Sequence, residues 1–338
     1  MKKIILIILI ISSASAYGQS SKKDSLLREI DERTKSVKKA ADQFLNKNFS
    51  VADRIKAIES YAIIYDETQS EQFKSIVLDD KEPPGIRAMA LNKIYQFIPG
   101  DERLESLTIE WLGNPQAPKV LRREAFQLEE ALSFLSMDVP DVYQKMLEDP
   151  EPEFRLFAFT RLIVHSDARA QQKLITGLEN PQLALLPAPA AIKILSLSAK
   201  KEYYPAVYKV LQQSKDEQTR LEAIRALSFY KDAREKIISI LHDTHEKEQL
   251  REAALEALYV GDRDNIVKYA SLILSDKSAT PHLQINAIQM TMDVRESMTF
   301  KVEGEYDLLI KRITQDKSSD PELQKIALEY LQSDRPKQ

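Results

Sequence analysis

Apolar residues recur along this chain at the three- and four-residue spacing of amphipathic helices, in pairs of short stripes separated by a polar turn. The pattern is clearest in residues 219–243, with a first stripe of Leu221, Ile224 and Leu227 and a second of Ile237, Ile238 and Leu241. The polar break between the two stripes is centred on Asp232. The segment therefore predicts two helices of about ten to fourteen residues, joined as an antiparallel hairpin.

One alanine marks the same place in every copy of this hairpin. Arg-x-x-Ala occurs six times, beginning at Arg54, Arg87, Arg122, Arg155, Arg220 and Arg251. Three further copies keep the Ala but have Ala188, Gln284 or Gln324 in place of the Arg. The alanines follow one another at 31 to 35 residues, with a last step of 40, at Ala57, Ala90, Ala125, Ala158, Ala191, Ala223, Ala254, Ala287 and Ala327. A small residue at this place predicts close approach of neighbouring helices.

A second marker closes the other half of each copy. A Leu is followed two residues later by Asp, Asn or Gln, and it precedes the next repeated Ala by 11 to 13 residues. The examples are Leu78/Asp80, Leu112/Asn114, Leu147/Asp149, Leu178/Asn180, Leu211/Gln213, Leu241/Asp243 and Leu274/Asp276. Two markers with one period and a fixed offset indicate a repeat array, in which neighbouring hairpins bury the flanks that one hairpin alone leaves exposed.

Polar residues at the helix ends predict how the copies are joined. The Asp, Asn or Gln of the closing marker suits a cap or a turn at each junction. The repeated Arg lies in the first turn of its helix, where the helix dipole disfavours a cation. We therefore expect it to pair with acidic groups of the preceding junction, giving a ladder of ion pairs. The alternative is an Arg whose aliphatic stem only covers apolar surface.

The pattern of Arg-x-x-Ala-x-x-x-Leu, a turn and Leu-x-x-x-Leu-x-Asp resembles HEAT repeats. The short unit is similar to the bacterial HEAT-like repeats of phycobilin-lyase-type proteins, and the resemblance extends from about Asp42 to Leu331. It implies an all-α fold, a right-handed α-solenoid (superhelix) of about eight to nine two-helix HEAT-like repeats. It also implies that the Arg-bearing helices line the concave side. The three copies without the Arg and the longer eighth copy depart from the family pattern.

The chain divides into four predicted parts. Residues 1–19 have the positive start, aliphatic run and small residues of a secretory signal peptide, and this run is too short for the rival interpretation, an uncleaved membrane anchor. Residues 20–46 predict a charged capping helix, with a coiled-coil dimer as the alternative. Residues 47–333 hold the repeats, and residues 334–338 are expected to be disordered. The extra length of the eighth copy falls in residues 293–307, as either a contact element or a neutral surface loop.

Composition narrows the classes of function. The chain has 48 Lys and Arg against 52 Asp and Glu, and it has no Cys. A mildly acidic chain is not typical of nucleic-acid binders. Without Cys, disulfides, thiol nucleophiles and Cys-ligated metals are excluded. The signal peptide predicts export, to the periplasm or out of the cell, and no later segment predicts a stable membrane span.

Sequence signatures of catalysis are missing. The chain has no Gly-x-Ser-x-Gly, no His-Glu-x-x-His, no phosphate loop and no dinucleotide fingerprint. His242 and His245 lie three apart beside acidic residues, but they fall at a junction where a helix ends, and no third His or Cys supports them. We therefore predict no catalytic, cofactor or metal site and a protein that is not an enzyme. Catalysis by carboxylates alone would leave no signature in the sequence.

The outward positions of the Arg-bearing helices provide the candidate surface. Residues one before and two after each repeated Ala point away from the packed stripe. In residues 154–162, aromatic rings fall on more than one side of a helix, which therefore either packs on several sides or binds a partner. The predicted partner-binding residues are Met89, Phe157, Thr160, Arg161 and Lys193.

These features favour a non-enzymatic exported scaffold or adaptor that binds a protein or peptide partner on the concave face of an α-solenoid. Two alternatives stay open. One is an envelope regulator of a membrane complex, with the less charged centre of the array as its docking strip. The other is an enzyme accessory of the lyase-associated HEAT-like kind, although a role in attaching tetrapyrroles fits poorly with export.

Overall fold

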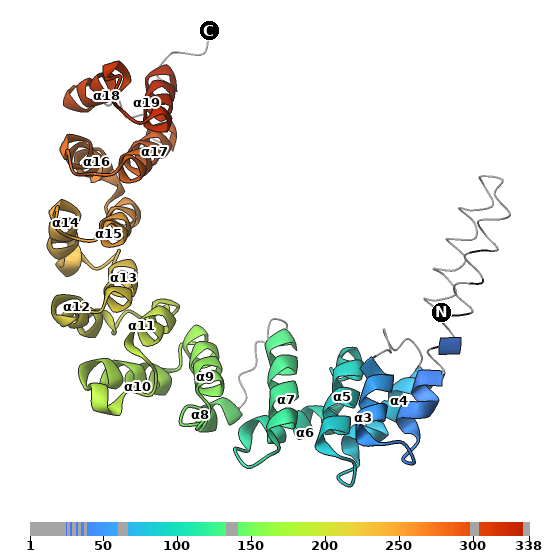
Figure 1. Ribbon diagram of the computed structural model, residues 1–338. Helices are drawn as coiled ribbons and strands as arrows, with labels where there is room; N and C mark the ends of the chain where they lie inside the picture. Colours follow the sequence, from blue (N-terminus) through green and yellow to red (C-terminus); the bar gives the residue numbers. More distant parts are fainter. Residues whose placement is uncertain are drawn as a thin grey trace. The chain divides into compact units, whose positions relative to one another are not determined.

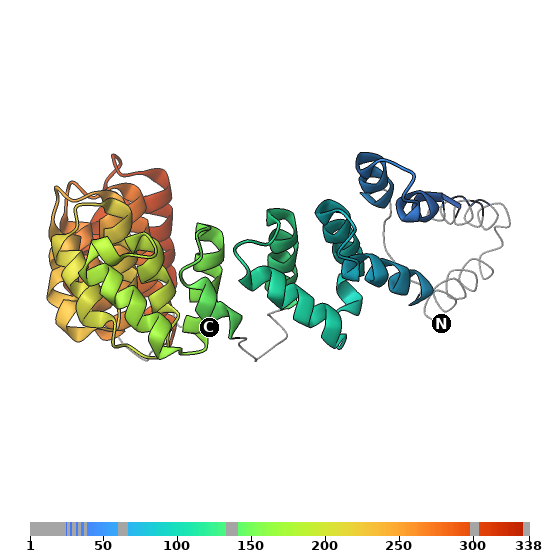
Figure 2. The ribbon, with the colours of Figure 1, turned by 90° about the horizontal axis from the view of Figure 1, so that it is seen from below.

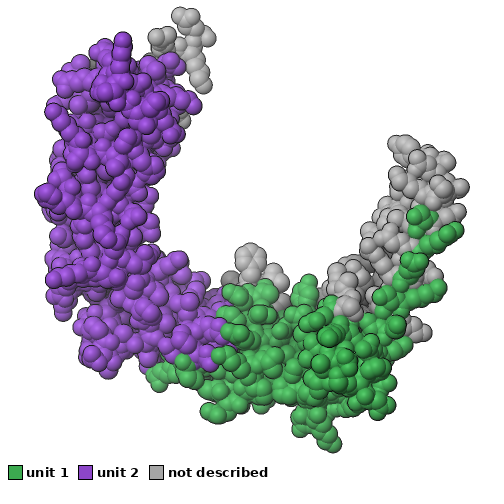
Figure 3. All heavy atoms as spheres, viewed as in Figure 1, with its two compact units in different colours: residues 1–150 green, residues 151–338 purple. Residues whose placement is uncertain are grey.

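The computed structural model describes residues 39–59, 67–132, 141–297 and 304–333, together with the isolated residues Ser25, Arg28, Glu32, Lys35 and Ser36. Within these residues every regular element is a helix and no strand occurs, as the repeat pattern predicts. The chain forms two compact units, Met1–Pro150 and Glu151–Gln338, here called unit 1 and unit 2 (Figure 3). In the described part, no helix has the length and apolar character needed to cross a bilayer. The predicted signal peptide and C-terminal tail lie outside the described residues.

The helices of unit 1 alternate between two layers. We call the helix that carries the repeated Ala the first helix of a pair, and the one after it the second helix. The first helices α3, α5 and α7 pack in sequence, as do the second helices α4, α6 and α8. Their bounds are α3 Val51–Glu59, α4 Glu67–Leu78, α5 Pro84–Ile94, α6 Glu102–Gly113, α7 Lys119–Leu132 and α8 Val142–Met146.

Unit 2 has the same alternation. Its first helices α9, α11, α13, α15, α17 and α19 each pack against the ones before and after them. The second helices α10, α12, α14, α16 and α18 lie in a separate row (Figure 1). Figure 2 looks along this row, so that successive pairs overlap. The bounds are α9 Pro152–Val164, α10 Ala168–Glu179, α11 Ala188–Ser196, α12 Tyr204–Gln213, α13 Glu217–Ala226, α14 Arg234–His242, α15 Glu248–Gly261, α16 Ile266–Ser275, α17 Pro281–Ser297, α18 Glu305–Gln315 and α19 Pro321–Ser333.

The repeated Ala is buried in all nine copies, between 0% and 6% exposed. The closing Leu is buried in six of its seven copies, and Leu78 is half-buried. Because Ala has only a methyl group, two helix backbones approach closely at each of these positions. The spacing of small and large apolar residues therefore predicts the core correctly.

Polar side chains turn the chain at the junctions between pairs. A side-chain oxygen accepts a hydrogen bond from the backbone N–H two residues later at Asn114, Asn180, Asp243 and Asp276. This Asx turn confirms the predicted role for four of the closing residues. The following first helix begins with Pro in α5, α9, α17 and α19, where the missing N–H is not needed.

The repeated Arg reaches back to the preceding pair through a backbone contact. In four copies its Nε atom donates to a carbonyl near the end of the preceding second helix, ten residues earlier, in the pairs Arg54–Phe44, Arg87–Val77, Arg122–Leu112 and Arg251–Leu241. The Nε atom of Arg155 donates instead to the Leu185 carbonyl at the following junction. Phe44 accepts from Arg54 Nε although it belongs to the helix that ends at Leu45. The end of the predicted N-terminal capping helix therefore takes the role of a second helix, and Phe44 stacks on Phe73 with ring centroids 5.1 Å apart.

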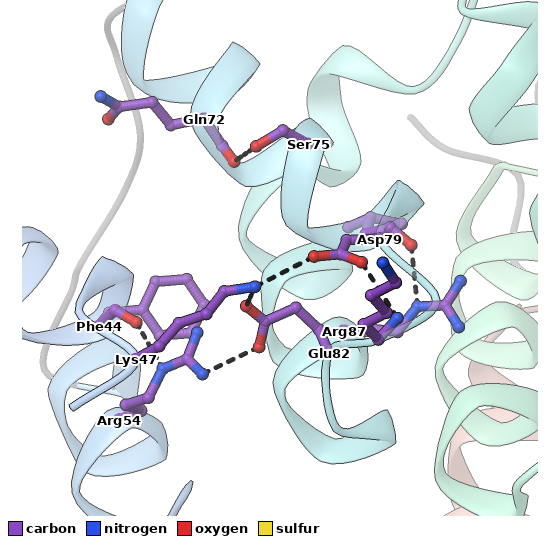
Figure 4. A network of polar contacts seen from close by, with 10 residues as sticks. Phe44, Lys47, Arg54, Gln72, Ser75, Asp79, Glu82 and Arg87 are labelled. Carbon is purple, nitrogen blue, oxygen red and sulfur yellow. Dashed lines mark hydrogen bonds and ion pairs between the residues drawn. The ribbon is translucent and has the colours of Figure 1, made fainter. Parts of the chain in front are cut away.

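The acidic partners of the repeated Arg lie at the following junction, so the expectation of the preceding junction is wrong. They are 25 to 28 residues after their Arg, in the pairs Arg54–Glu82, Arg122–Asp149, Arg220–Glu246 and Arg251–Asp276. Figure 4 shows Arg54 and Lys47 converging on Glu82, with N–O distances of 2.8 and 3.0 Å. The physical reason in Arg54, Arg122 and Arg251 is that a carbonyl of the preceding helix already accepts the hydrogen bond from Nε. The remaining N–H groups then point toward the next pair.

Other contacts replace the ion pair in copies that lack the acidic residue or the repeated Arg. The junction after Arg87 has Asn114 in place of an acid, and the Arg87 guanidinium lies 4.8 Å from the centroid of the Trp111 ring. Gln324, which replaces the Arg, still donates a 2.5 Å hydrogen bond to the carbonyl of Asp316 after the preceding helix. In the eighth copy, part of the extra length forms the end of the 17-residue helix α17. Residues 298–303 of this extra length lie outside the described residues.

Candidate partner-binding surface

Of the two positions that the sequence predicts to face outward on the first helices, only one is generally exposed. The residue two after the repeated Ala is exposed in eight copies, at Glu59, Asn92, Gln127, Lys193, Arg225, Glu256, Gln289 and Glu329. The ninth, Thr160, is half-buried. The residues one before the Ala are more enclosed, and Ala253 is buried.

The predicted partner-binding residues are only partly brought together. Phe157, Thr160 and Arg161 lie on α9, and the exposed Lys193 lies on the neighbouring α11 of unit 2. Met89 lies on α5 in unit 1, and it is half-buried. Four of the five residues thus belong to one pair of packed helices.

The aromatic helix α9 packs on several sides. Phe154 and Phe159 are 0% exposed, so they belong to the core, and Phe157 is half-buried. The Thr160 hydroxyl donates a 2.8 Å hydrogen bond to the Leu156 carbonyl of its own helix. Arg161 keeps a buried Nε that has no hydrogen-bond partner among the described residues. The first of the two interpretations, packing, therefore accounts for most of this segment.

A row of exposed apolar side chains, which the sequence reasoning missed, follows the ends of four consecutive first helices. Each member lies six residues after a repeated Ala, and the exposed fractions are 52% for Val164, 51% for Leu197, 65% for Phe229 and 50% for Val260. We call these four residues the apolar row. In the other copies the same position is polar, at Gln96, Asp293 and Ser333, small, at Ala131, or apolar, at Ile63, which lies outside the described residues. Comparing this one position across the copies would have found the row.

Backbone packing fixes the register of the row between α13 and α15. A Cβ atom added to Gly261 would overlap the carbonyl group of Ser228. Gly261 follows Val260 and Ser228 precedes Phe229, so the two row members project from backbone segments in direct contact. Arg234 holds the same edge by donating a 3.2 Å hydrogen bond to the Gly261 carbonyl. Phe229 and Val260 are therefore presented by a rigid, closely packed edge.

Charged residues accompany the row one helical turn earlier. Lys193 and Arg225 precede Leu197 and Phe229 by four residues, and Glu256 precedes Val260 by the same spacing. Residues four apart lie on one face of a helix, so Glu256 borders Val260 on α15, and Lys193 borders Leu197, which follows α11 with helical backbone angles. Phe229 lies three residues beyond the end of α13, so Arg225 is its neighbour in the sequence. Arg225 contacts Glu222 at 3.5 Å but stays 53% exposed. Lys193 and Glu256 make no ion pair within the described residues. The surface thus carries cations beside two members of the row and an anion beside the fourth.

Open grooves separate neighbouring first helices. In unit 2 a groove of about 430 Å³ runs between α13 and α15, lined by Glu217, Gln218, Leu221, Arg225, Gln249, Glu252, Ala253 and Glu256. In unit 1 the corresponding groove between α5 and α7 measures about 210 Å³. Small-molecule sites are typically enclosed and mainly apolar, with a few converging polar groups. A charged, open groove such as that of unit 2 suits the side chains of a bound polypeptide better.

One group of side chains in the described part has the composition of a metal site. Ligand atoms of Glu248, Glu252 and His282 lie within 4.8 Å of one another. However, His282 Nδ1 is 2.5 Å from a Glu252 oxygen, and the Thr280 hydroxyl donates to Glu248. These contacts join α15 to α17 and satisfy both carboxylates. The arrangement is therefore explained as a contact between repeats, and His242 and His245 do not contribute to it.

A half-buried carboxyl on α7, that of Glu124, has an altered acidity. Burial raises the pKa of Glu124, and a 2.7 Å hydrogen bond from the Asn92 amide opposes this rise. A general acid–base pair needs a second titratable group at hydrogen-bond distance. Because the contact to Glu124 is an amide, this site resembles a bridge between α5 and α7 more than a catalytic centre.

Comparison with protein-family models gives no match, and comparison with curated proteins gives none either.

Proposed function

We propose that this protein is an exported, non-enzymatic scaffold or adaptor that binds a protein partner, and that its repeats form a right-handed α-solenoid of the HEAT-like kind. The repeat spacing and the pairwise packing of first helices support the solenoid. The signal-peptide pattern of residues 1–19 supports export. The partner-binding surface is the apolar row with its charged neighbours.

The observation that carries the proposal is the exposure of four apolar side chains at one repeat position. Single exposed apolar residues are ordinary on protein surfaces, but a contiguous series at equivalent positions of packed helices is not. Aromatic and aliphatic anchors held on a rigid frame are the usual energetic centre of protein interfaces. Phe229, at 65% exposed, is the leading candidate for such an anchor.

The proposal is tested by capture of a partner from the envelope fraction of the source cells. The purified mature chain serves as bait, beside the double variant Leu197→Asp/Phe229→Asp. The matched control is Leu308→Asp, because Leu308 is 55% exposed but lies on the second helix α18. We expect one defined protein to bind the wild type and the control and to be lost with the double variant, at unchanged helicity. Equal capture by all three would contradict the proposal.

A further inference from the structure

We propose that the element that docks on the apolar row is an amphipathic helix with acidic side chains over α11 and α13 and a basic side chain over α15. This inference rests on the proposed function, and it specifies the chemistry of the partner. Its basis is the combination of regular apolar anchors with charges that change sign along the row.

The spacing of the anchors suits a helix. Packed α-helices lie about 8–10 Å apart, so successive members of the apolar row repeat at roughly this distance. A helix that presents an apolar residue every seven positions repeats at about 10.5 Å. Same-face residues of a strand repeat at about 7 Å or 13 Å, which does not match. A partner helix laid across the ends of α9, α11, α13 and α15 can therefore contact each member in turn.

The charged residues near the apolar row determine in which direction the partner helix would bind. Lys193 is exposed beside Leu197, and Arg225, Lys200 and Lys231 are exposed within four residues of Phe229 or Leu197 in the sequence. Four residues before Val260 the exposed charge is Glu256, and Arg263, three residues after Val260, pairs with Asp293. A partner with carboxylates along its centre and a Lys or Arg at the α15 end pairs with both signs, and the reverse arrangement places like charges together. Such complementarity sets orientation and selectivity, whereas the apolar anchors supply most of the affinity.

A protein partner fits this surface better than an anionic membrane. The exposed carboxylates Asp232, Glu256 and Asp264 lie within four residues of Phe229 or Val260 in the sequence. A bilayer is uniformly negative and would meet these groups together with the cations. A polypeptide can vary its charge along its length, as the row does.

The test uses two synthetic helical peptides and the full mature chain. Both peptides carry Leu at the first and fourth positions of four heptads. The matched peptide has Glu beside the two central heptads and Lys at one end, and the inverted peptide exchanges Glu and Lys. We expect fluorescence anisotropy to show at least tenfold tighter binding of the matched peptide at low salt, with the preference reversed by Lys193→Glu/Arg225→Glu. The variant Leu197→Asp/Phe229→Asp should bind neither peptide, whereas Leu308→Asp should bind the peptides as the wild type does.

Failure of this inference can be told apart from failure of the scaffold. If the captured envelope partner depends on Phe229 but is indifferent to Lys193→Glu/Arg225→Glu, the scaffold stands and the acidic helix is overturned. Equal binding of the two peptides also overturns it. Binding to phosphatidylglycerol vesicles that is lost with Phe229→Asp, without selective peptide binding, would assign the row to a membrane surface instead.

Discussion

Arg251 donates from Nε to the backbone carbonyl of Leu241, ten residues earlier, at 3.0 Å. Arg251 lies in the first turn of α15, where the dipole of its own helix is unfavourable for a cation. Leu241 lies in the last turn of α14, where carbonyls lack partners within the helix and a cation is favourable. The Arg251 side chain therefore caps the C-terminal end of α14, although its backbone belongs to the first turn of α15. This capping explains why a charged residue recurs at this place.

The strongest energetic effect is expected at the buried pair Arg122–Asp149. The two side chains are 3% and 1% exposed, and their closest N–O distance is 2.5 Å. Arg122→Ala leaves a buried carboxylate without its charge partner and also removes the donor to Leu112. We expect a loss of about 3–5 kcal/mol in the free energy of unfolding. Urea denaturation followed by circular dichroism measures it.

The matched control for that variant replaces both partners. Arg122→Met with Asp149→Leu removes the two charges together, so no uncompensated charge remains. Buried ion pairs replaced by apolar residues of similar size are often neutral or stabilising. The double variant should therefore be more stable than Arg122→Ala. If the two are equally unstable, the backbone contact to Leu112 outweighs the ion pair.

Gly261 is expected to tolerate no side chain. Gly261→Ala would push its Cβ into the Ser228 carbonyl, a backbone group that cannot rotate away. We expect a destabilisation of about 1–3 kcal/mol in unit 2, because the edge of α15 must shift. Gly85→Ala is the control, since its Cβ would meet only the Ile55 Cδ1 atom at 3.5 Å. The control should be neutral or slightly stabilising in thermal unfolding, by up to about 1 kcal/mol.

The repeated Ala should not accept a larger apolar residue. Ala254 is fully buried on α15, which packs between α13 and α17. Leu at this position would add three carbon atoms to a filled interface, and overpacking typically costs about 1–3 kcal/mol. Ala168→Leu, at the exposed start of α10, is the control and should change stability by less than about 0.5 kcal/mol. Equal melting temperatures for both variants would contradict close packing at the repeated Ala.

The sequence predicts the core well and the contacts of the charged residues poorly. The burial of Ala57 to Ala327 follows from spacing alone, because a 33-residue period fixes which side of each helix meets its neighbours. The acid partner of Arg54 does not follow, since junctions on both sides of a first helix offer polar groups and only the structure shows that Phe44 occupies Nε. The direction of a side chain at a helix end thus depends on packing that a one-dimensional pattern does not contain.

The apolar row was missed for a related reason. Its members differ in type, as Val, Leu and Phe, and they follow no motif. Their exposure depends on where each first helix ends: α11 ends at Ser196 and α13 ends at Ala226, before their row members. Hydrophobic periodicity treats the sixth residue after the repeated Ala as part of a helix. However, the ends of helices are the part of a sequence-based prediction that is least certain. Of the predicted site, Lys193 borders the row, whereas Phe157 is half-buried.

Lowering the pH should weaken the ion pairs between repeats, because each pair depends on an ionised carboxylate. Burial acts to raise the pKa of Glu82, but the hydrogen bonds and charges of Arg54 and Lys47 outweigh it and hold this pKa below the ordinary value of 4.5. The hydrogen bond from Arg220 likewise lowers the pKa of Glu246. For Asp276, burial is again outweighed, by Ser278 and Arg251, and the pKa is lowered. A carboxyl with a lowered pKa in the folded state stabilises the fold above its unfolded-state pKa. It loses this contribution as the pH falls through the folded-state value.

We therefore expect the free energy of unfolding to be level from about pH 7 to pH 5 and to fall steeply below about pH 4.5. Glu82→Gln should be less stable than the wild type at neutral pH, because it removes the ionised partner of the buried Arg54. The two curves should converge in acid, where the wild-type carboxyl also becomes neutral. Glu102→Gln, at the exposed start of α6, is the control and should follow the wild-type curve. Urea titrations at each pH give the comparison, and a constant gap between Glu82→Gln and the wild type down to pH about 3 would show that Glu82 does not act through its charge.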